Sequence, residues 1–126
     1  MEAFERMRAA LTATAVFFDF DKALIRTDQT MTVSDNAKLA SSFSNDYVTL
    51  QGNCDERGSR EYNLALGQRR ADVVKERMVL MGVPDSRIET ISFGREKPRA
   101  LCHDESCWQE NRRADFVHAW KEASSR

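Results

Sequence analysis

The sequence predicts a single α/β (α+β sandwich) domain in the order β-α-β-α-β-β, with a mixed four-stranded sheet and its helices on one face. The 126 residues suffice for one compact domain and are too few for two. Short apolar segments flank one long segment of helical periodicity, and 41% of the residues are hydrophobic. We place the domain at residues 15–120, between an N-terminal segment or linker (1–14) and a C-terminal tail (121–126). Whether residues 1–14 form a linker, a helix or an expression artefact stays open.

Two strands and a helix are predicted in the first part of the domain. Residues 15–20 (AVFFDF) are apolar and rich in aromatic rings, which is typical of a buried strand that ends at Asp21. Apolar residues recur at three-to-four spacing from 28 to 43, which predicts a helix despite many Ser and Thr. Residues 47–51 alternate as in a half-buried strand that ends at Gly52.

A long helix is predicted over residues 60–81, where the helical pattern is most regular. Ser59 is a good N-cap, and Glu61 complements the positive end of the helix dipole. The segment 82–84 (GVP) ends the helix. The predicted core stripe advances in steps of three and four through Leu64, Gly67, Ala71, Val74, Met78 and Met81.

The last part of the domain contains two further strands. Residues 88–93 are predicted as the third strand, and residues 94–107 form an irregular loop with two cysteines. One helical turn at 108–112 then precedes the last strand at 114–120.

Composition restricts the function classes. Nineteen Lys and Arg against twenty Asp and Glu give a net charge of -1, which disfavours sequence-independent nucleic-acid binding. The sequence has no apolar run near the roughly 20 residues of a membrane span, and its start has neither a signal-peptide core nor a lipidation motif. We therefore expect a soluble chain. Fourteen of the nineteen basic residues are Arg, whose planar fork suits carboxylate partners.

Arg70 has the most unusual predicted position in the long helix. At 100° per residue it lies about 70° from the centre of the apolar stripe, whereas Arg69 points to solvent. A guanidinium at the edge of a core requires a carboxylate, and the preceding loop supplies Asp55. Two interpretations stay open: an internal ion pair between them, or a cleft where both bind a ligand with an ammonium and a carboxylate. Asn63 projects within about 20° of Arg70 with Gly67 between them, so we expect a gap there.

Several segments together form a specific signature. The longest is 52–71 (GNCDERGSREYNLALGQRRA), and the others are 18–22 (FDFDK), 92–98 (SFGREKP) and 111–114 (NRRA). In this order and at this spacing they closely resemble the OmpA-like C-terminal domain family, in particular its lipoprotein branch. The resemblance covers roughly residues 15–120.

The resemblance implies non-covalent binding of the peptidoglycan stem peptide through meso-diaminopimelate, without enzymatic activity, cofactor or metal. By position, Asp55 would bind the ammonium of diaminopimelate and Arg70 its carboxylate. Gly67 would leave room for the ligand backbone. The other positions that match the family's binding pocket are Asp21, Asn63 and Arg113.

The resemblance also implies a location and partners. The domain would tether the outer membrane to peptidoglycan at the periplasmic face of a Gram-negative envelope, within a Tol-Pal-type system. Membrane contact would come only through an upstream lipid anchor, and a TolB-like periplasmic protein would be a further partner. The alternative in another class is a periplasmic protein-interaction module.

The cysteines and histidines are interpreted against the same background. Cys102 and Cys107 are five residues apart, which allows a disulfide, and the periplasmic location that the family implies permits it. Two free thiols, or a metal site that includes His103, are the alternatives, although no fourth metal ligand is apparent. Cys54 is interpreted as a small buried residue, and His118 as a residue on a strand face.

A phosphatase is the remaining alternative. The pair Asp19 and Asp21 after an apolar strand resembles the nucleophile loop of haloacid-dehalogenase-type phosphatases. In those enzymes Gly-Thr usually follows, whereas this chain has Lys22 and Ala23. No later acidic pair follows a strand, so we expect no such activity.

Overall fold

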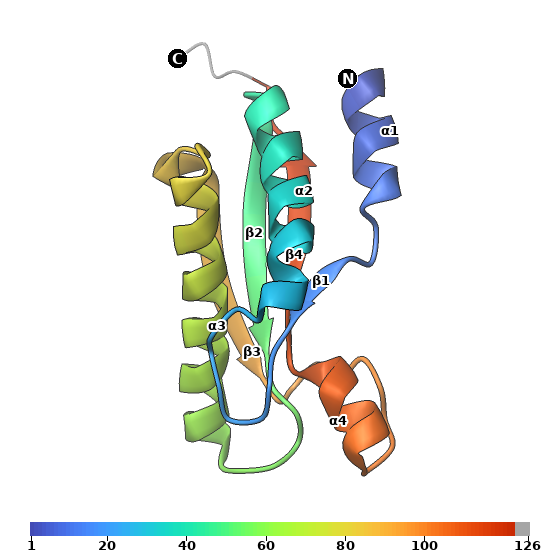
Figure 1. Cartoon of the computed structure of the whole chain (residues 1–126), viewed down its shortest axis with the longest axis vertical. Helices are drawn as coiled ribbons and strands as arrows, with labels where there is room; N and C mark the ends of the chain where they lie inside the picture. Colours follow the sequence, from blue (N-terminus) through green and yellow to red (C-terminus); the bar gives the residue numbers. More distant parts are fainter. Residues whose placement is uncertain (123–126) are drawn as a thin grey trace.

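Four helices and one open, mixed four-stranded sheet make up residues 1–122, the part of the chain that the computed structural model describes (Figure 1). The helices are α1 (Glu2–Ala10), α2 (Thr30–Ser42), α3 (Arg60–Leu80) and α4 (Glu105–Asn111). The strands are β1 (Ala15–Phe17), β2 (Asp46–Asn53), β3 (Ile88–Gly94) and β4 (Arg113–Trp120). Two short 3-10 helices, Thr27–Gln29 and Asp85–Arg87, precede α2 and β3.

The strand order in the sheet is β1-β4-β2-β3. Strands β2 and β3 run parallel, with Val48 opposite Ile88, while β4 is antiparallel to both β2 and β1. The two longer helices, α2 and α3, cover one face of the sheet (Figure 1). The predicted mixed sheet with helices on one face is therefore confirmed.

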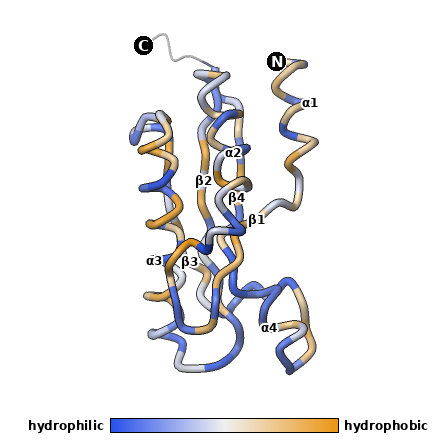
Figure 2. The backbone as a smooth tube through the Cα atoms, viewed as in Figure 1, coloured by the Kyte–Doolittle hydropathy of each residue, from blue (hydrophilic) through white to orange (hydrophobic). Residues whose placement is uncertain are grey.

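The core lies between this helical layer and the two central strands. Hydrophobic residues of β2, α2 and α3 contribute to this core, and Figure 2 shows hydrophobic positions along β2 and α3. Among the described residues, no helix is both long and apolar enough to cross a membrane. The core consists of Val16, Phe18, Val33, Ala37, Ala40, Val48, Leu50, Ala71, Val74, Met78, Val83, Ile88 and Ala114.

The ends of α3 agree with the sequence, and its buried face agrees in part: Gly67, Ala71, Val74 and Met78 are buried as predicted. Ser59 Oγ accepts a hydrogen bond from the Tyr62 backbone N–H at 3.1 Å, and Gly82 follows the helix with a φ of +103°. Leu64 is only half-buried and Met81 is 36% exposed. The buried residues of the first half instead include Asn63 and Arg70. The reason is that these two side chains meet main-chain carbonyls at the ends of β1 and β2: Asn63 donates to Arg57, and Arg70 donates to Lys22 and Asn53.

Strand β1 is shorter than predicted because its partner β4 begins only at Arg113. Ladder pairing therefore stops at Phe17. The Phe18 carbonyl accepts a hydrogen bond from Arg112 Nε at 2.9 Å instead. Asp21 then adopts a left-handed φ of +57° and turns the chain toward α3.

The segment before the sheet is a helix that packs on the domain. Phe4 of α1 is fully buried, with its ring centroid 5.6 Å from that of Phe43 and 5.2 Å from that of Trp120. Arg8 adds a hydrogen bond from Nη1 to the carbonyl of His118 at 3.3 Å. Of the two predicted flanking segments, the first is therefore largely helical. In the C-terminal tail, residues 123–126 lie outside the described part.

His118 is a strand residue, as predicted, and its side chain is buried under α2. Its Nδ1 lies 2.5 Å from Asp46 Oδ2, and its Nε2 lies 2.8 Å from Asn36 Oδ1. The imidazole therefore links the central strands to α2.

Candidate ligand-binding site

A cavity of about 100 Å³ lies where the loop after β1, the end of β2 and the start of α3 meet. Four of the five residues predicted to bind a ligand are among those that line it. The lining consists of Phe20, Asp21, Cys54, Asp55, Arg57, Gly58, Tyr62, Asn63, Leu66 and Arg70.

Arg70 is fully buried at the inner end of this cavity, on the face of α3 toward the sheet. Its guanidinium donates to three main-chain carbonyls: from Nε to Lys22 at 2.9 Å, from Nη1 to Asn53 at 2.9 Å and from Nη2 to Asp19 at 3.2 Å. Burial lowers the pKa of Arg70 below its ordinary value. Five N–H groups serve a guanidinium, so two are left for another acceptor.

Asp55 is buried in the same cavity but pairs with other arginines. Its Oδ2 lies 2.7 Å from Arg57 Nη2 and 3.5 Å from Arg112 Nη1. Burial would raise the pKa of the Asp55 carboxyl, but hydrogen bonds from Arg57 outweigh it and lower the pKa below its ordinary value. The interpretation as an internal Arg70–Asp55 ion pair is therefore wrong, because two nearer cations neutralise the carboxylate.

The mouth of the cavity is formed by polar groups from α3 and the loop after β1. Tyr62 donates a hydrogen bond from its hydroxyl to Asp21, and both side chains are exposed. Asn63 is buried and donates from Nδ2 to the Arg57 carbonyl at 2.7 Å. Asn63 thus fixes the loop before α3, and Asp21 offers a carboxylate at the entrance.

The fifth predicted residue, Arg113, lies elsewhere. Its Nε is 3.0 Å from Asp115 Oδ2, and its Nη2 donates to the Lys97 carbonyl at 3.3 Å. Arg112 is the arginine of this pair that reaches Asp55, while its other bonds hold Glu105 at 2.8 Å. Neighbouring residues of an extended chain point to opposite sides, which separates the two guanidinium groups.

Gly67 does not border the cavity, contrary to expectation. A Cβ at Gly67 would lie 2.3 Å from Ser92 Oγ, and a Cβ at Gly52 would lie 1.7 Å from the Gly67 carbonyl oxygen. The two glycines therefore allow α3 and β2 to touch, and the gap expected for a ligand backbone is filled by protein.

Three residues at the site had no predicted role. The Arg57 guanidinium carbon lies 4.0 Å from the ring centroid of Phe20 and 4.0 Å from that of Trp108. The aromatic rings come from the loop after β1 and from α4, which are far apart in the sequence. Arg57 lies in the signature 52–71, two residues after Asp55, and Trp108 directly follows the second loop cysteine, but neither pattern indicates their contact.

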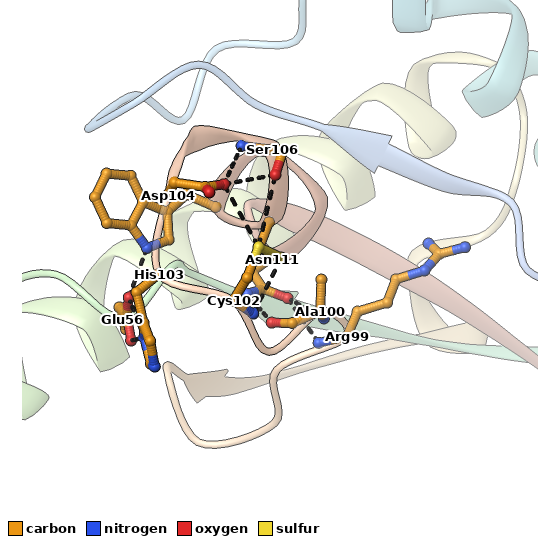
Figure 3. Close-up of a disulfide and its surroundings, with 10 residues drawn as sticks. Glu56, Arg99, Ala100, Cys102, His103, Asp104, Ser106 and Asn111 are labelled. Carbon is orange, nitrogen blue, oxygen red and sulfur yellow. Dashed lines mark hydrogen bonds and ion pairs between the residues drawn. A yellow bond between two sulfur atoms is a disulfide. The ribbon is translucent and has the colours of Figure 1, made fainter.

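The loop before α4 is closed by a disulfide between Cys102 and Cys107 (Figure 3). Although Asp104 lies beside the two sulfur atoms, a bonded sulfur pair offers no thiolate to a metal. His103, between the two cysteines, has its Nδ1 2.7 Å from Glu56 Oε1 (Figure 3). The free-thiol and metal alternatives therefore do not describe this loop, which instead contacts the segment between Asp55 and Arg57.

Cys54 is the free thiol among the described residues, and it is buried, as predicted. Its Sγ donates to the Asn63 carbonyl at 3.3 Å. Burial raises the pKa of Cys54 to about 11. The thiol is therefore a packed group beside the cavity.

Asp19 and Asp21 do not act as a pair. The Asp19 carboxylate lies 3.3 Å from Arg26 Nη1, whereas Asp21 accepts from Tyr62. Two adjacent catalytic carboxylates would have to face the same reacting atom. This arrangement therefore gives no support to the phosphatase alternative.

The chain is thus an α/β domain whose open mixed sheet is covered by helices on one face. Its cavity is lined by a carboxylate, Asp55, and a guanidinium, Arg70, that do not pair with each other. The OmpA family matches residues 17–114, and the chain belongs to this family.

Two curated relatives of the chain are called peptidoglycan-associated lipoproteins. The chain is 50% identical over 102 residues to the one of Agrobacterium fabrum, and this match covers 81% of the chain and 58% of the relative. The chain is 42% identical over 109 residues to the peptidoglycan-associated lipoprotein of Pseudomonas aeruginosa, and this match covers 86% of the chain and 64% of the relative. The chain thus spans about three-fifths of the length of these relatives.

Solved structures agree with this assignment. The crystal structure of the peptidoglycan-associated lipoprotein from Burkholderia pseudomallei superposes with a TM-score of 0.81 at 45% identity, over 83% of this chain and 89% of that one. The C-terminal domain of Helicobacter pylori MotB gives a TM-score of 0.78 at 17% identity, over 86% and 85%. The second likeness concerns the fold alone.

Proposed function

We propose that the domain binds the peptidoglycan stem peptide non-covalently through the side-chain end of meso-diaminopimelate. That end carries an ammonium and a carboxylate on one carbon atom. Asp55 would accept the ammonium and Arg70 would donate to the carboxylate. The observation that carries the proposal is that both groups line one cavity without pairing with each other.

The charges at the site support this assignment. Three neutral carbonyls accept hydrogen bonds from Arg70, and among the described residues no carboxylate forms an ion pair with it. A ligand carboxylate would supply the compensating negative charge and accept hydrogen bonds from the two remaining N–H groups of Arg70. Asp21 would stand at the entrance, and Asn63 would hold the loop that carries Asp55. A contact from Arg113 stays a prediction, since its guanidinium is paired with Asp115 outside the cavity.

The names of the relatives support a proposal for the wider role. Proteins called peptidoglycan-associated lipoproteins share 42% and 50% of the matched residues with this chain. We therefore place the domain at the periplasmic face of the outer membrane in a Gram-negative envelope, where it would tether that membrane to the cell wall. A lipid anchor upstream and a TolB-like partner in a Tol-Pal-type system belong to the same proposal. Recognition would make and break no covalent bond.

Calorimetric titration with two stem peptides tests the function. One peptide contains meso-diaminopimelate, and the other has lysine in its place, which lacks the side-chain carboxylate. We expect binding of the first peptide only. Asp55→Asn should weaken it roughly tenfold or more, because each charge-assisted hydrogen bond contributes about 1.5 to 3 kcal/mol.

Conservative arginine variants complete the test. Arg70→Lys keeps the charge but loses the fork that holds three carbonyls, and it should weaken binding. The same exchange at exposed Arg69 is the matched control and should leave binding unchanged. Arg113→Lys shows whether that residue contributes. Equal binding of both peptides, or of neither, by a folded domain would contradict the proposal and direct the search to a protein ligand.

A further inference from the structure

The two charged groups at the site are covered in the structure. Arg70 has no exposed surface, and the Asp55 side chain is only 5% exposed. The cavity of about 100 Å³ is also smaller than the roughly 300 Å³ at the lower end of small-molecule sites. A ligand that pairs with Asp55 must therefore displace a protein group that now covers the carboxylate.

The group that covers Asp55 is Arg57. It contacts both carboxylate oxygens, from Nη2 to Oδ2 at 2.7 Å and from Nε to Oδ1 at 3.2 Å. The Arg57 backbone N–H also donates to Oδ1 at 3.0 Å. The side chain of Arg57 thus occupies the carboxylate as a bound ammonium would, with a positive charge and hydrogen-bond donors.

Aromatic rings on both sides hold this guanidinium in place. Phe20 and Trp108 each lie 4.0 Å from it, a distance at which cation–π attraction is strong. Trp108 is itself fixed, because its Nε1 donates to Glu56 Oε2 at 2.7 Å. The disulfide loop contributes His103, which contacts the same carboxylate (Figure 3). The loop after β1, helix α4 and the disulfide loop therefore together position the Arg57 guanidinium.

The other cation near Asp55 is not free to leave. Arg112 has a side chain only 5% exposed, and it is engaged by Glu105 and by the Phe18 carbonyl. Its distance to Asp55 is 3.5 Å, against 2.7 Å for Arg57. The Arg57 side chain, in contrast, is 35% exposed and can move outward into solvent. Arg57 is the removable partner.

We propose that Arg57 is an internal competitor for Asp55, which a ligand ammonium must displace, and that it thereby sets the affinity and selectivity of the site. This inference rests on the proposed function. While Arg57 is seated, the site is not competent to bind, so the apparent dissociation constant rises by the inverse of the competent fraction. A lone cation cannot displace Arg57 efficiently, whereas a ligand whose carboxylate also reaches Arg70 gains a second contact.

Titration of the meso-diaminopimelate peptide into variants tests the competition. Arg57→Gln removes the competing charge and keeps the backbone N–H bond to Asp55, and binding should tighten on the order of tenfold. Arg60→Gln is the matched control. It removes an equal charge three residues away, where Arg60 forms an ion pair with exposed Glu96, and it should leave affinity within about twofold. Circular dichroism establishes that each variant is folded.

Arg57→Lys keeps the charge but cannot hold both carboxylate oxygens, so its affinity should lie between those of the wild type and Arg57→Gln. If Arg57→Gln binds the peptide more tightly than Arg60→Gln does, the competition is supported. This comparison holds even if the wild type binds too weakly to measure. Equal or weaker binding by Arg57→Gln, with a wild type that binds, overturns the competition alone. Should Arg57→Gln not fold, an affinity of Arg57→Lys at or below the wild-type value overturns it. Absence of binding by every protein overturns the proposed function together with this inference.

Discussion

At the scale of single residues, the site is a balance between burial and charge. Asp55 and Arg70 lie in one cavity, yet each is satisfied by other groups: two arginines for the carboxylate, and three carbonyls for the guanidinium. Uncompensated charges in a protein interior are costly, so each must keep partners when no ligand is present. The proposed binding by Asp55 therefore has to be considered together with the groups that pair with it.

The pKa of Asp55 should depend on Arg57. In the wild type this pKa lies below the ordinary value, so the carboxylate is ionised at neutral pH and becomes protonated only as the pH falls through the lowered pKa. Its contribution to stability is complete above the unfolded pKa of about 3.9 and is lost on the same descent. Arg57→Gln should raise this pKa, because burial then has less opposition. Carboxyl chemical shifts in a pH titration measure it, with Arg60→Gln as control, and an unchanged pKa would contradict the assignment.

Cys54 should be inert in the native protein. With a pKa of about 11 instead of the ordinary 9.0, about one thiol in a thousand is ionised at pH 8, and the thiolate is the reactive form. We expect alkylation by iodoacetamide at pH 8 to be at least about a hundredfold slower than in guanidinium-unfolded protein. Mass spectrometry of timed samples measures the rates. Rapid modification of the folded domain would show that the thiol is accessible.

At the scale of elements, α3 and β2 are held together by two glycines. Helix and strand approach so closely at Gly67 and Gly52 that neither position has room for a side chain. The same contact aligns Arg70 of α3 with the end of β2, whose last residue, Asn53, offers its carbonyl. The glycines therefore position the site without touching a ligand.

Gly67→Ala should destabilise the domain. Alanine would normally stabilise a helix interior by about 1 kcal/mol relative to glycine. Here its Cβ would lie 3.0 Å from the Gly52 carbonyl oxygen and 2.3 Å from Ser92 Oγ, and such overpacking costs about 1 to 3 kcal/mol. The difference between these two contributions is a net loss of up to about 2 kcal/mol, which urea unfolding measures. Glu76→Ala on the exposed face of α3 is the control, and a gain of stability in Gly67→Ala would refute the contact.

The disulfide loop is the second element that shapes the site. A chain-entropy argument for its short ring gives a stabilisation of about 2 kcal/mol. Replacing Cys102 and Cys107 together by serine should lower the free energy of unfolding by about this amount. Denaturant curves of the double variant and of the reduced wild type should then coincide. Wild-type stability in the double variant would show that hydrogen bonds alone order the loop.

At the scale of the whole molecule, the site and the N-terminus lie at opposite ends. The loops after β1 and before α3 are at one end of the sheet, whereas α1 starts at the other (Figure 1). Phe4 packs there against Trp120, the last residue of β4. An anchor attached upstream of α1 would thus be at the end of the domain opposite the cavity, which suits the proposed tether.

Tethering strength should depend on the number of copies. Repeated stem peptides in the wall allow a second domain on the same carrier to bind at high effective concentration, which raises avidity by about a hundredfold or more. Two domains joined by a flexible linker should therefore leave diaminopimelate-type sacculi far more slowly than one. Sedimentation of sacculi after dilution measures the release. Identical release of the single and joined domains would show that one site suffices.

Local patterns were sufficient to predict most elements and the family. The boundaries of α3 follow from Ser59 and Gly82, because capping and left-handed turns are decided by neighbouring residues. The dense signature at 52–71 placed Asp55 and Arg70 near one cleft. In contrast, the end of β1 depends on where β4 begins, and α1 owes its packing to distant Phe43 and Trp120.

Short-range periodicity and a long motif were enough to predict most elements, the family and four residues that line one cavity. The pairing of charges, in contrast, follows from the folded arrangement. Arg57 rather than Arg70 holds Asp55, Arg113 turns to Asp115, and Gly67 packs on β2. These outcomes depend on distances between segments far apart in the chain, and spacing along a sequence carries no such distances.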